Sequence, residues 1–405
     1  MGECKRLKTW LGSSPLSLME GSGMKRAVGL LLVLVLLASV IPLGAGAVEL
    51  NVAGKSALLM DVATGTVLYE NNAHEPLAPA SVTKVMTMLL IMEAIDAGKI
   101  AWEDMVTTSE AAAAKGGSQV YLKVGESMSV SDMVKSIAVS SANDCACAMA
   151  EHIAGSESAF VDKMNEKAKV LGMENTHFVN CTGLDDDPSA AEHRTSALDI
   201  ALMSRALLKD HPAITQYTTI WMDTVRGGAF GLSNTNKLVR FYSGATGLKT
   251  GFTSGAGYCL SASAKRDGME LIAVVMGAET SQDRFAACKS MLDYGFANFA
   301  VVQPQLTGAL TVPVVLGKQD QVNAVPGEEA QMLIDKAQKD QVVTDIALDP
   351  SVTAPVSKGQ RLGTLTLKSG EQILRQVPLV AENGVQRLSF GEIFLQVLRR
   401  LAMAK

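Results

Sequence analysis

The sequence is poor in the residues that mark several classes of protein. Its six cysteines form no Cys-x-x-Cys pair and no Cys/His ligand spacing, so we expect no zinc site and no other bound metal. Aromatic residues make up only 5% and charged residues 19%, while 48% are hydrophobic, which is typical of a globular chain and excludes a disordered one. The formal net charge of −5 provides no overall basic field, so we expect no nucleic acid partner.

The cysteines also lack the pattern of a disulfide framework. Cys4 precedes a predicted export signal and would be removed with it. Cys145 and Cys147 are two residues apart, which on a helix points their side chains to different sides. With Cys181, Cys259 and Cys288, they leave an odd number in the mature chain. We therefore expect buried free thiols.

The longest apolar run spans residues 27–43 and has the surroundings of a secretory signal. Met24-Lys25-Arg26 precedes it and Ala45-Gly46-Ala47 follows it, which is the order of basic, apolar and small residues that signal peptidases recognise. We expect Met24 to be the start and cleavage to follow Ala47, so that residues 1–47 are an extension and signal. A retained membrane anchor is the alternative, against which Pro42 argues.

Residues 48–300 contain strand patterns at both ends and helical patterns between them. Residues 56–60 and 66–69 predict a hairpin, residues 109–209 are rich in helix, and Ser131 is expected to cap one of those helices. Three more strands (245–252, 257–265 and 269–276) precede a closing helix over 281–296, and Asp267-Gly268 predicts a tight turn between the last two. This order predicts an α+β domain, an antiparallel sheet covered by helices.

The chain changes character after residue 300. Short Val/Leu-rich segments broken by Gly, Pro and Asp predict a small all-β domain over residues 301–385, with strands at 310–316, 329–333, 341–346, 361–367 and 371–377. We find no constellation of catalytic groups in it.

Residues 386–405 predict an amphipathic helix. Ser389 and Glu392 form a capping box, and apolar side chains then fall on one helical face, opposite a polar one. Such a helix is too amphipathic to span a bilayer but suits a membrane surface. The alternative is a helix packed on its own domain. The apolar face comprises Phe390, Ile393, Phe394, Val397, Leu398 and Leu401.

Three short motifs carry the chemistry. In Pro79-Ala80-Ser81-Val82-Thr83-Lys84, the spacing places Lys84 over Ser81 on one helical face, a nucleophile beside a base. Ser141-Ala142-Asn143 interrupts a helical pattern with short polar side chains, and Lys249-Thr250-Gly251 lies on a predicted edge strand whose glycine permits a close approach. Alone, Ser81 suits a helix cap and Lys84 a solvated lysine. The three motifs in this order argue for catalysis.

In these three motifs and their order, the sequence resembles the serine penicillin-binding proteins and serine β-lactamases. The resemblance is greatest to the low-molecular-mass D,D-carboxypeptidases and covers the whole predicted exported part. It implies an enzyme at the outer face of the cytoplasmic membrane, where the terminal helix would bind the membrane surface. Its substrate would be the pentapeptide stem of peptidoglycan, and its covalent ligands β-lactam antibiotics. The resemblance implies no cofactor, and the oligomeric state is left open.

The resemblance also implies a role for each motif residue. Ser81 would attack the carbonyl between two terminal D-alanines, Lys84 as a neutral amine would take its proton, and Ser141 would pass a proton to the leaving amine. Asn143 would hold the substrate amide, and the backbone N–H groups of Ser81 and Phe252 would hold the oxyanion. The remaining residues of the predicted site are those for the substrate carboxylate and its strand: Lys249, Thr250, Gly251 and Arg284.

Several neighbouring residues have plainer interpretations. Arg284 is alternatively a structural residue near a helix N-terminus. His193 suits a cap or loop better than a catalyst, and Asp185-Asp186-Asp187 suits a solvated turn better than a metal site.

Two rival functions are weighed against the carboxypeptidase. A class A β-lactamase needs an acidic base on a loop between the second and third motifs, with an asparagine soon after it, and residues 174–187 do not reproduce that pattern. The small β domain and terminal helix have no place in a compact β-lactamase. A non-catalytic cell-wall binding protein is the other rival, and the intact motifs argue against it.

Overall fold

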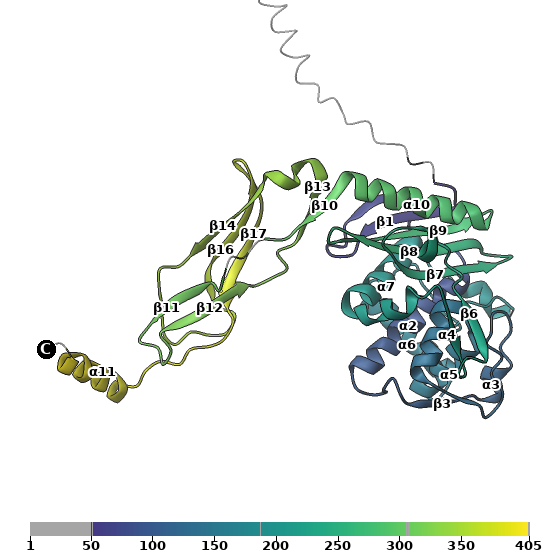
Figure 1. Ribbon diagram of the computed structural model, residues 1–405, viewed down its shortest axis with the longest axis horizontal. Coiled ribbons are helices and arrows are strands. Elements are labelled where there is room, and N and C mark those ends of the chain that lie inside the picture. Colours follow the sequence, from purple (N-terminus) through teal and green to yellow (C-terminus); the bar gives the residue numbers. More distant parts are fainter. Residues whose placement is uncertain (1–49, 51, 187, 305, 307, 404–405) are drawn as a thin grey trace, which may run out of the picture. The chain divides into compact units, whose positions relative to one another are not determined.

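The computed structural model describes residues 50, 52–186, 188–304, 306 and 308–403 (Figure 1). The predicted extension and signal at 1–47, with Cys4, lie outside the described residues. Within the part that is described, no helix has the length and apolar character needed to cross a membrane.

A five-stranded antiparallel sheet joins the two ends of the predicted α+β region. Its strand order is β2-β1-β9-β8-β7, so the N-terminal hairpin pairs through β1 with β9. The predicted hairpin and the three later strands are therefore confirmed, and β7 lies at an edge. The strands are β1 (Ser56–Asp61), β2 (Val67–Asn71), β7 (Ala245–Thr253), β8 (Gly257–Arg266) and β9 (Met269–Ala278).

The turn between β8 and β9 forms as the sequence predicts. Arg266 pairs with Met269, and the two residues between them, Asp267 and Gly268, have φ of +49° and +81°. Two positive φ angles give the backbone twist that a two-residue hairpin turn requires, and Asp-Gly tolerates them well.

Helices cover the sheet and build the core. In Figure 1, α10 (Ser281–Asn298) packs on one face of the sheet and α7 (Ala197–Asp210) on the other. Helix α2 (Lys84–Asp96) lies deeper, and it is apolar on nearly every side because it is buried on nearly every side. The other long helices of this region are α4 (Val130–Ser140), α5 (Asn143–Ala154) and α6 (Glu157–Val170).

Short elements complete the helical region. Two small two-stranded sheets pair β3 with β4 and β5 with β6. These elements are η1 (Ala80–Thr83), β3 (Met105–Thr107), α3 (Glu110–Ala113), β4 (Ser127–Ser129), η2 (Pro188–Glu192), η3 (Pro212–Ile214), α8 (Thr215–Thr218), β5 (Met222–Val225), β6 (Phe230–Ser233) and α9 (Leu238–Phe241).

The predicted cap at Ser131 is wrong. Helix α4 begins at Val130, and Ser129 Oγ accepts the N–H of Asp132 at 3.1 Å. The β3–β4 ladder carries the chain in extended form through Ser129, so this residue has the backbone conformation of an N-cap. Ser131 instead hydrogen-bonds through its hydroxyl to the Tyr217 hydroxyl at 2.9 Å.

The predicted all-β region is confirmed, with differences in its strands. A segment left unassigned by the sequence forms β12, whose Val322 and Ala324 point inward in alternation with polar neighbours. The strand expected at 329–333 forms instead as β13 (Met332–Asp335) and pairs with β10 (Phe299–Val302), followed by η4 (Lys336–Gln341). The six-stranded sheet has the order β14-β16-β17-β12-β11-β15. Its strands are β11 (Thr311–Val315), β12 (Gln321–Pro326), β14 (Val342–Leu348), β15 (Val352–Thr353), β16 (Arg361–Ser369) and β17 (Gln372–Ala381).

The C-terminal helix α11 (Phe390–Met403) forms with its predicted capping box. The backbone N–H of Ser389 donates to Glu392 Oε2 at 2.7 Å, and the N–H of Glu392 donates back to Ser389 Oγ at 3.4 Å. Phe390 is 86% and Phe394 57% exposed. The choice between a membrane-bound helix and one seated on its own domain stays a prediction.

The cysteines of the described chain are unpaired. Cys145, Cys147, Cys181, Cys259 and Cys288 are all buried free thiols. This confirms the prediction made for these residues.

Candidate active site

The first motif forms a turn that feeds a buried helix. Ser81 lies within the 3-10 helix η1, and α2 starts at Lys84, where the sequence predicted one continuous α-helix. Lys84 Nζ donates to Ser81 Oγ at 3.0 Å and to the carbonyl oxygen of Thr182 at 2.8 Å. Lys84 is fully buried. The interpretation of Lys84 as a solvated lysine is therefore wrong.

The environment of Lys84 favours a neutral amine. Burial lowers the pKa of this amine from 10.5 to about 7, against the opposing influence of Cys181 and Asp144. A lysine that is largely deprotonated just above neutral pH has a free lone pair. It can then act as the base for the adjacent hydroxyl.

The second motif occupies the link between α4 and α5. Ser141 follows the last residue of α4 and adopts φ +62°, a left-handed conformation that is uncommon for serine. Asn143 begins α5, and its Nδ2 donates to the carbonyl oxygen of Gly116 at 2.7 Å. Its Oδ1 is buried and has no hydrogen-bond partner among the described residues. A buried orphan acceptor is costly, which makes Oδ1 a candidate contact for a ligand N–H.

The third motif lies on the edge strand β7. Lys249 is buried, and its Nζ donates to the carbonyl oxygen of Thr250 at 2.8 Å. Burial, followed by the positive charges of Lys84 and Arg284, lowers the pKa of Lys249 well below its usual value. Thr250 Oγ1 donates to Thr235 Oγ1 at 2.6 Å. The strand thus presents one cation and one hydroxyl side by side.

Gly251 brings the third motif against the first. A Cβ atom at this position would lie 2.7 Å from the Pro79 carbonyl oxygen and 3.1 Å from the Ser81 nitrogen. Only glycine permits this approach. The next residue, Phe252, has a side chain that is 53% exposed and stacks on Tyr258 with ring centroids 4.3 Å apart.

Arg284, a residue predicted to contact a substrate carboxylate, makes contacts with two backbone carbonyls of the sheet. It is buried, and its Nη1 donates to the carbonyl oxygens of Gly251 at 2.8 Å and Cys259 at 3.2 Å. Its guanidinium lies 5.2 Å from the centroid of the Tyr258 ring. Its Nε is buried and has no hydrogen-bond partner among the described residues, so its contact with a substrate carboxylate stays a prediction beside the structural alternative.

The neighbouring polar residues include His193 and the acidic run at 185–187. His193 is buried and hydrogen-bonds to Thr83 and Val179, in agreement with a loop residue. Asp185 and Asp186 are described, whereas Asp187 lies outside the described residues. Among the described residues, no group of three or more His, Cys, Asp or Glu side chains is arranged to hold a metal ion.

Sequence reasoning missed the loop that receives Lys84. Asn180 Oδ1 accepts the N–H groups of Thr182 and Gly183 at 3.1 and 2.7 Å, which holds the Thr182 carbonyl in place. Asn180 and Gly183, three residues apart, are a sequence signal for a turn, but no nearby residue indicates that this turn contacts Lys84. A cleft of about 560 Å³ begins here, bounded by Thr182, Leu184, Asp186 and Gly116 among others.

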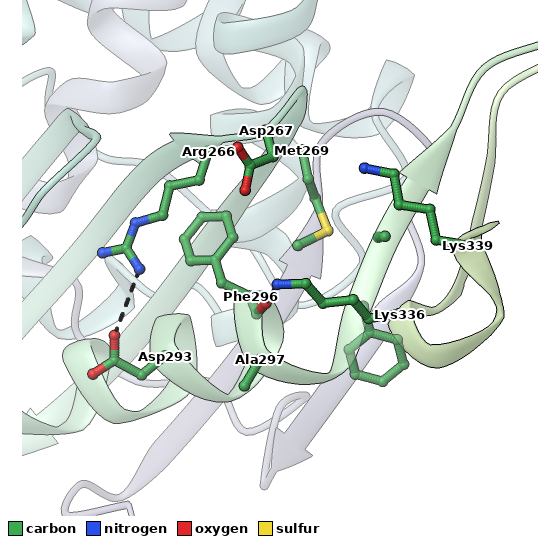
Figure 2. Close-up of a pocket in the computed structure, with 10 residues that line it drawn as sticks. Arg266, Asp267, Met269, Asp293, Phe296, Ala297, Lys336 and Lys339 are labelled. Atoms are coloured by element: carbon green, nitrogen blue, oxygen red, sulfur yellow. Dashed lines mark hydrogen bonds and ion pairs between the residues drawn. The ribbon is translucent and has the colours of Figure 1, made fainter.

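A second hollow, of about 350 Å³, lies beside the β8–β9 turn (Figure 2). In it Arg266 pairs with Asp293 at 3.9 Å, and its guanidinium lies 4.7 Å from the centroid of the Phe296 ring. None of the three motifs contributes a residue to its lining. The 560 Å³ cleft is likewise lined by no motif residue, but its Thr182 supplies the carbonyl oxygen that accepts from Lys84 Nζ, so it adjoins the motifs whereas the second hollow does not.

Known proteins match both parts of the chain. Residues 44–280 match the family model of D-alanyl-D-alanine carboxypeptidases, and residues 304–387 match that of the C-terminal domain of penicillin-binding protein 5. The D-alanyl-D-alanine carboxypeptidase DacF of Bacillus subtilis is 43% identical over 379 residues, which are 91% of this chain and 96% of that protein.

Solved structures agree with these matches. Penicillin-binding protein 5 from Haemophilus influenzae superposes with a TM-score of 0.68 at 31% identity, covering 83% of this chain and 98% of that one. Penicillin-binding protein D2 from Listeria monocytogenes, in an ampicillin-bound form, has a TM-score of 0.56 at 32% identity and covers 61% of this chain and 99% of that one. The chain belongs to the serine-type D-alanyl-D-alanine carboxypeptidase family, among the low-molecular-mass penicillin-binding proteins.

Proposed function

We propose that this carboxypeptidase removes the terminal D-alanine of peptidoglycan stem peptides through an acyl-enzyme on Ser81. The observation that carries the proposal is the 3.0 Å contact between Lys84 Nζ and Ser81 Oγ, made by an amine whose pKa burial lowers to about 7. A hydroxyl and a neutral amine in direct contact are an activated nucleophile and its base.

Acylation is the first half of the reaction. Ser81 Oγ attacks the carbonyl carbon between the two D-alanines while its proton passes to Lys84. The oxygen of the tetrahedral intermediate would lie between the backbone N–H groups of Ser81 and Phe252. The close approach of Gly251 to the Ser81 nitrogen supports this, since it brings the two N–H groups to one place.

The leaving group then departs and water completes the cycle. The C–N bond breaks as Ser141 passes its proton to the amine of the departing D-alanine and takes in its place the proton that Lys84 received from Ser81, which leaves Lys84 neutral again. Water next attacks the ester on Ser81, which frees the shortened peptide as a carboxylate and restores the serine hydroxyl. Attack by water on the ester needs the base a second time, and Lys84 is the amine within reach.

Substrate binding is assigned to the second and third motifs. The orphan Oδ1 of Asn143 suits an amide N–H of the substrate, and Lys249 with Thr250 suits its terminal carboxylate. Because Gly251 has no side chain, β7 can approach the turn that contains Ser81. Arg284 holds the backbone of that strand and acts as a positioning residue.

β-Lactams would acylate the same serine and leave slowly. Among the described residues, the hydrogen bonds of Lys84 run to Ser81 and to the Thr182 carbonyl, without a carboxylate partner. An acidic base near the ester is what gives a class A β-lactamase its rapid release. The site therefore supports a carboxypeptidase over that rival.

Mass spectrometry of the protein after labelling with penicillin tests the proposal. We expect the adduct on the peptide that contains Ser81, with a lifetime long enough for digestion and analysis. An adduct on another residue would disprove the nucleophile. Rapid turnover of a chromogenic cephalosporin would show a β-lactamase instead.

We further propose an exported protein held at the outer face of the cytoplasmic membrane. Residues 48–300 would form the catalytic domain, 301–385 a separate β domain, and 386–405 the membrane-binding helix. The exposed apolar side chains of α11 support the last assignment, because water is a poor solvent for Phe390, Phe394 and Leu398.

A further inference from the structure

A buried chain of hydrogen bonds runs beneath the nucleophile. Val179 donates its backbone N–H to His193 Nδ1 at 3.2 Å, and His193 Nε2 lies 2.8 Å from Thr83 Oγ1. Thr83 Oγ1 in turn donates to the carbonyl oxygen of Ala80 at 2.9 Å. His193 and Thr83 are both buried, so water does not compete for these contacts.

The donor and the acceptor can be identified for each hydrogen bond in this series. Because Nδ1 of His193 accepts the N–H of Val179, the ring proton must be on Nε2. Nε2 then donates to Thr83 Oγ1, which has one proton and uses it on Ala80. Burial first, then the electrostatic influence of neighbouring basic side chains, lowers the pKa of His193 to about 4, so the ring stays neutral near neutral pH.

This series of hydrogen bonds ends at Ala80, a strained residue next to Ser81. Ala80 has φ +49°, a left-handed conformation that costs an alanine about 1 kcal/mol or more. Its carbonyl oxygen is held between Thr83 and Gly183, where an added Cβ would lie only 1.8 Å from it. This peptide group also carries the N–H of Ser81, so a turn of the Ala80 carbonyl turns the proposed oxyanion donor.

This series of hydrogen bonds starts at Val179, in the loop whose Thr182 carbonyl accepts a hydrogen bond from Lys84. Residues 179–183 include Thr182, whose carbonyl oxygen accepts from Lys84 Nζ at 2.8 Å. His193 therefore touches both segments on which the reaction depends: the loop that holds the base and the turn that holds the nucleophile. We propose that His193, protonated on Nε2, is a positioning residue that ties this loop to the Ser81 turn and sets the geometry of acylation.

The proposal rests on Ser81 and Lys84 being the nucleophile and base. It assigns no contact between His193 and substrate. It predicts a defect in the acylation rate without a matching defect in binding, because Asn143 and Thr250 lie outside the chain of hydrogen bonds. Small displacements of reacting groups cost up to about 100-fold in rate.

Two conservative variants of His193 separate its two nitrogens. In His193→Gln the side-chain amide nitrogen reaches about as far as Nε2 and can still donate to Thr83. In His193→Asn the amide ends near the position of Nδ1 and falls short. We expect the acylation rate constant at saturating penicillin to fall about tenfold or more in the Asn variant, and by less in the Gln variant, which keeps the contact with Thr83 but loses the one with Val179. Half-saturating concentrations should be unchanged in both.

Thr83 supplies an independent pair in case the Asn variant does not fold. Thr83→Ser keeps the hydroxyl and should acylate at close to the wild-type rate, whereas Thr83→Val loses it and should be slow. Adding His193→Asn to Thr83→Val should cause little further loss, since both act through one chain. Thermal melts of the full-length variants are recorded alongside, to relate each rate to folding.

Three outcomes would overturn the proposal: equal rates in the Gln and Asn variants, equal rates in the Ser and Val variants, or fully additive losses in the double variant. Failure of the proposed function looks different. In that case wild-type protein itself would carry no penicillin on Ser81, whatever stands at position 193.

Discussion

The catalytic cluster and helix α11 depart from the usual partition of residues in opposite ways. The cluster buries Lys84 and Lys249, whereas α11 leaves Phe390 86% exposed. Buried charge and exposed apolar side chains are the two informative exceptions on a folded protein. In the cluster each amine has a hydrogen-bond partner inside the chain. The side chain of Phe390 is largely uncovered within the described chain, which is the observation behind the proposed membrane-binding role of α11.

Replacement of the nucleophile should have the largest effect. In Ser81→Ala, release of D-alanine from a diacyl-D-Ala-D-Ala peptide should fall by at least about 10³-fold, because Ser81 has the only hydroxyl hydrogen-bonded to Lys84 Nζ among the described residues. Ser351→Ala, at an exposed serine of the β domain, is the matched control and should retain full activity. An unchanged rate in Ser81→Ala with folding preserved would refute the mechanism.

The acidity of Lys84 should control the pH profile. With its pKa lowered to about 7, the base is protonated and inactive at lower pH, so kcat/KM should fall about tenfold per pH unit well below 7. Lys84→Arg remains charged throughout and should be inactive at every pH. A flat wild-type profile between pH 5 and 9 would argue against Lys84 as the base.

The same shift bears on stability. Because the pKa of Lys84 is about 7 when folded and 10.5 by its usual value, the unfolded chain binds the extra proton between these pH values. The contribution of this group to the free energy of unfolding should therefore rise with pH across that window. Denaturant titrations of wild type and Lys84→Met at pH 7 and 9 would measure it.

Replacing Gly251, which is closely packed against the first motif, should have a moderate effect on acylation. In Gly251→Ala the new methyl would meet the Pro79 carbonyl and the Ser81 nitrogen, so we expect acylation by penicillin to slow by about tenfold to 100-fold. Gly231→Ala is the control, since a Cβ there meets nothing within 4 Å. Equal acylation rates in the two variants would show that β7 does not constrain the nucleophile.

Changes in α11 should have the smallest effect on catalysis. Removal of residues 389–405 should shift the protein from the membrane to the soluble fraction while kcat/KM for a soluble peptide stays within about twofold, because catalysis and membrane binding use separate surfaces. Phe394→Asp should weaken binding to anionic vesicles, and Gln396→Asp on the polar face much less. Fractionation that is unchanged by the truncation would rule out the helix as the anchor.

The fold could be predicted where the pattern is local and strong. The Asp267-Gly268 turn, the strands around it and the Ser389/Glu392 capping box all depend on residues close in sequence. The errors came where distant packing decides. Ser131 has a good capping side chain, but the β3–β4 pairing sets the start of α4 at Val130.

Some site residues could be placed from local sequence, and others only from the packing of distant segments. The spacing of Ser81 and Lys84 correctly placed one side chain over the other, and the hydrogen bond between them follows. Arg284 could not be assigned from its neighbours in sequence. Its guanidinium serves the Gly251 carbonyl, 33 residues away, and that contact exists only once α10 packs on the sheet.

The sequence by itself determined the identity and order of the reactive groups around Ser81 and Lys84, together with the local elements that carry them. Tertiary structure alone decided the rest: the Thr182 carbonyl that receives Lys84 lies 98 residues away, and Gly251 meets the Ser81 turn from another strand. The lowered pKa of Lys84 belongs to this second group, since its largest cause is burial. Burial depends on every segment packed around a group, so a short stretch of sequence does not contain it.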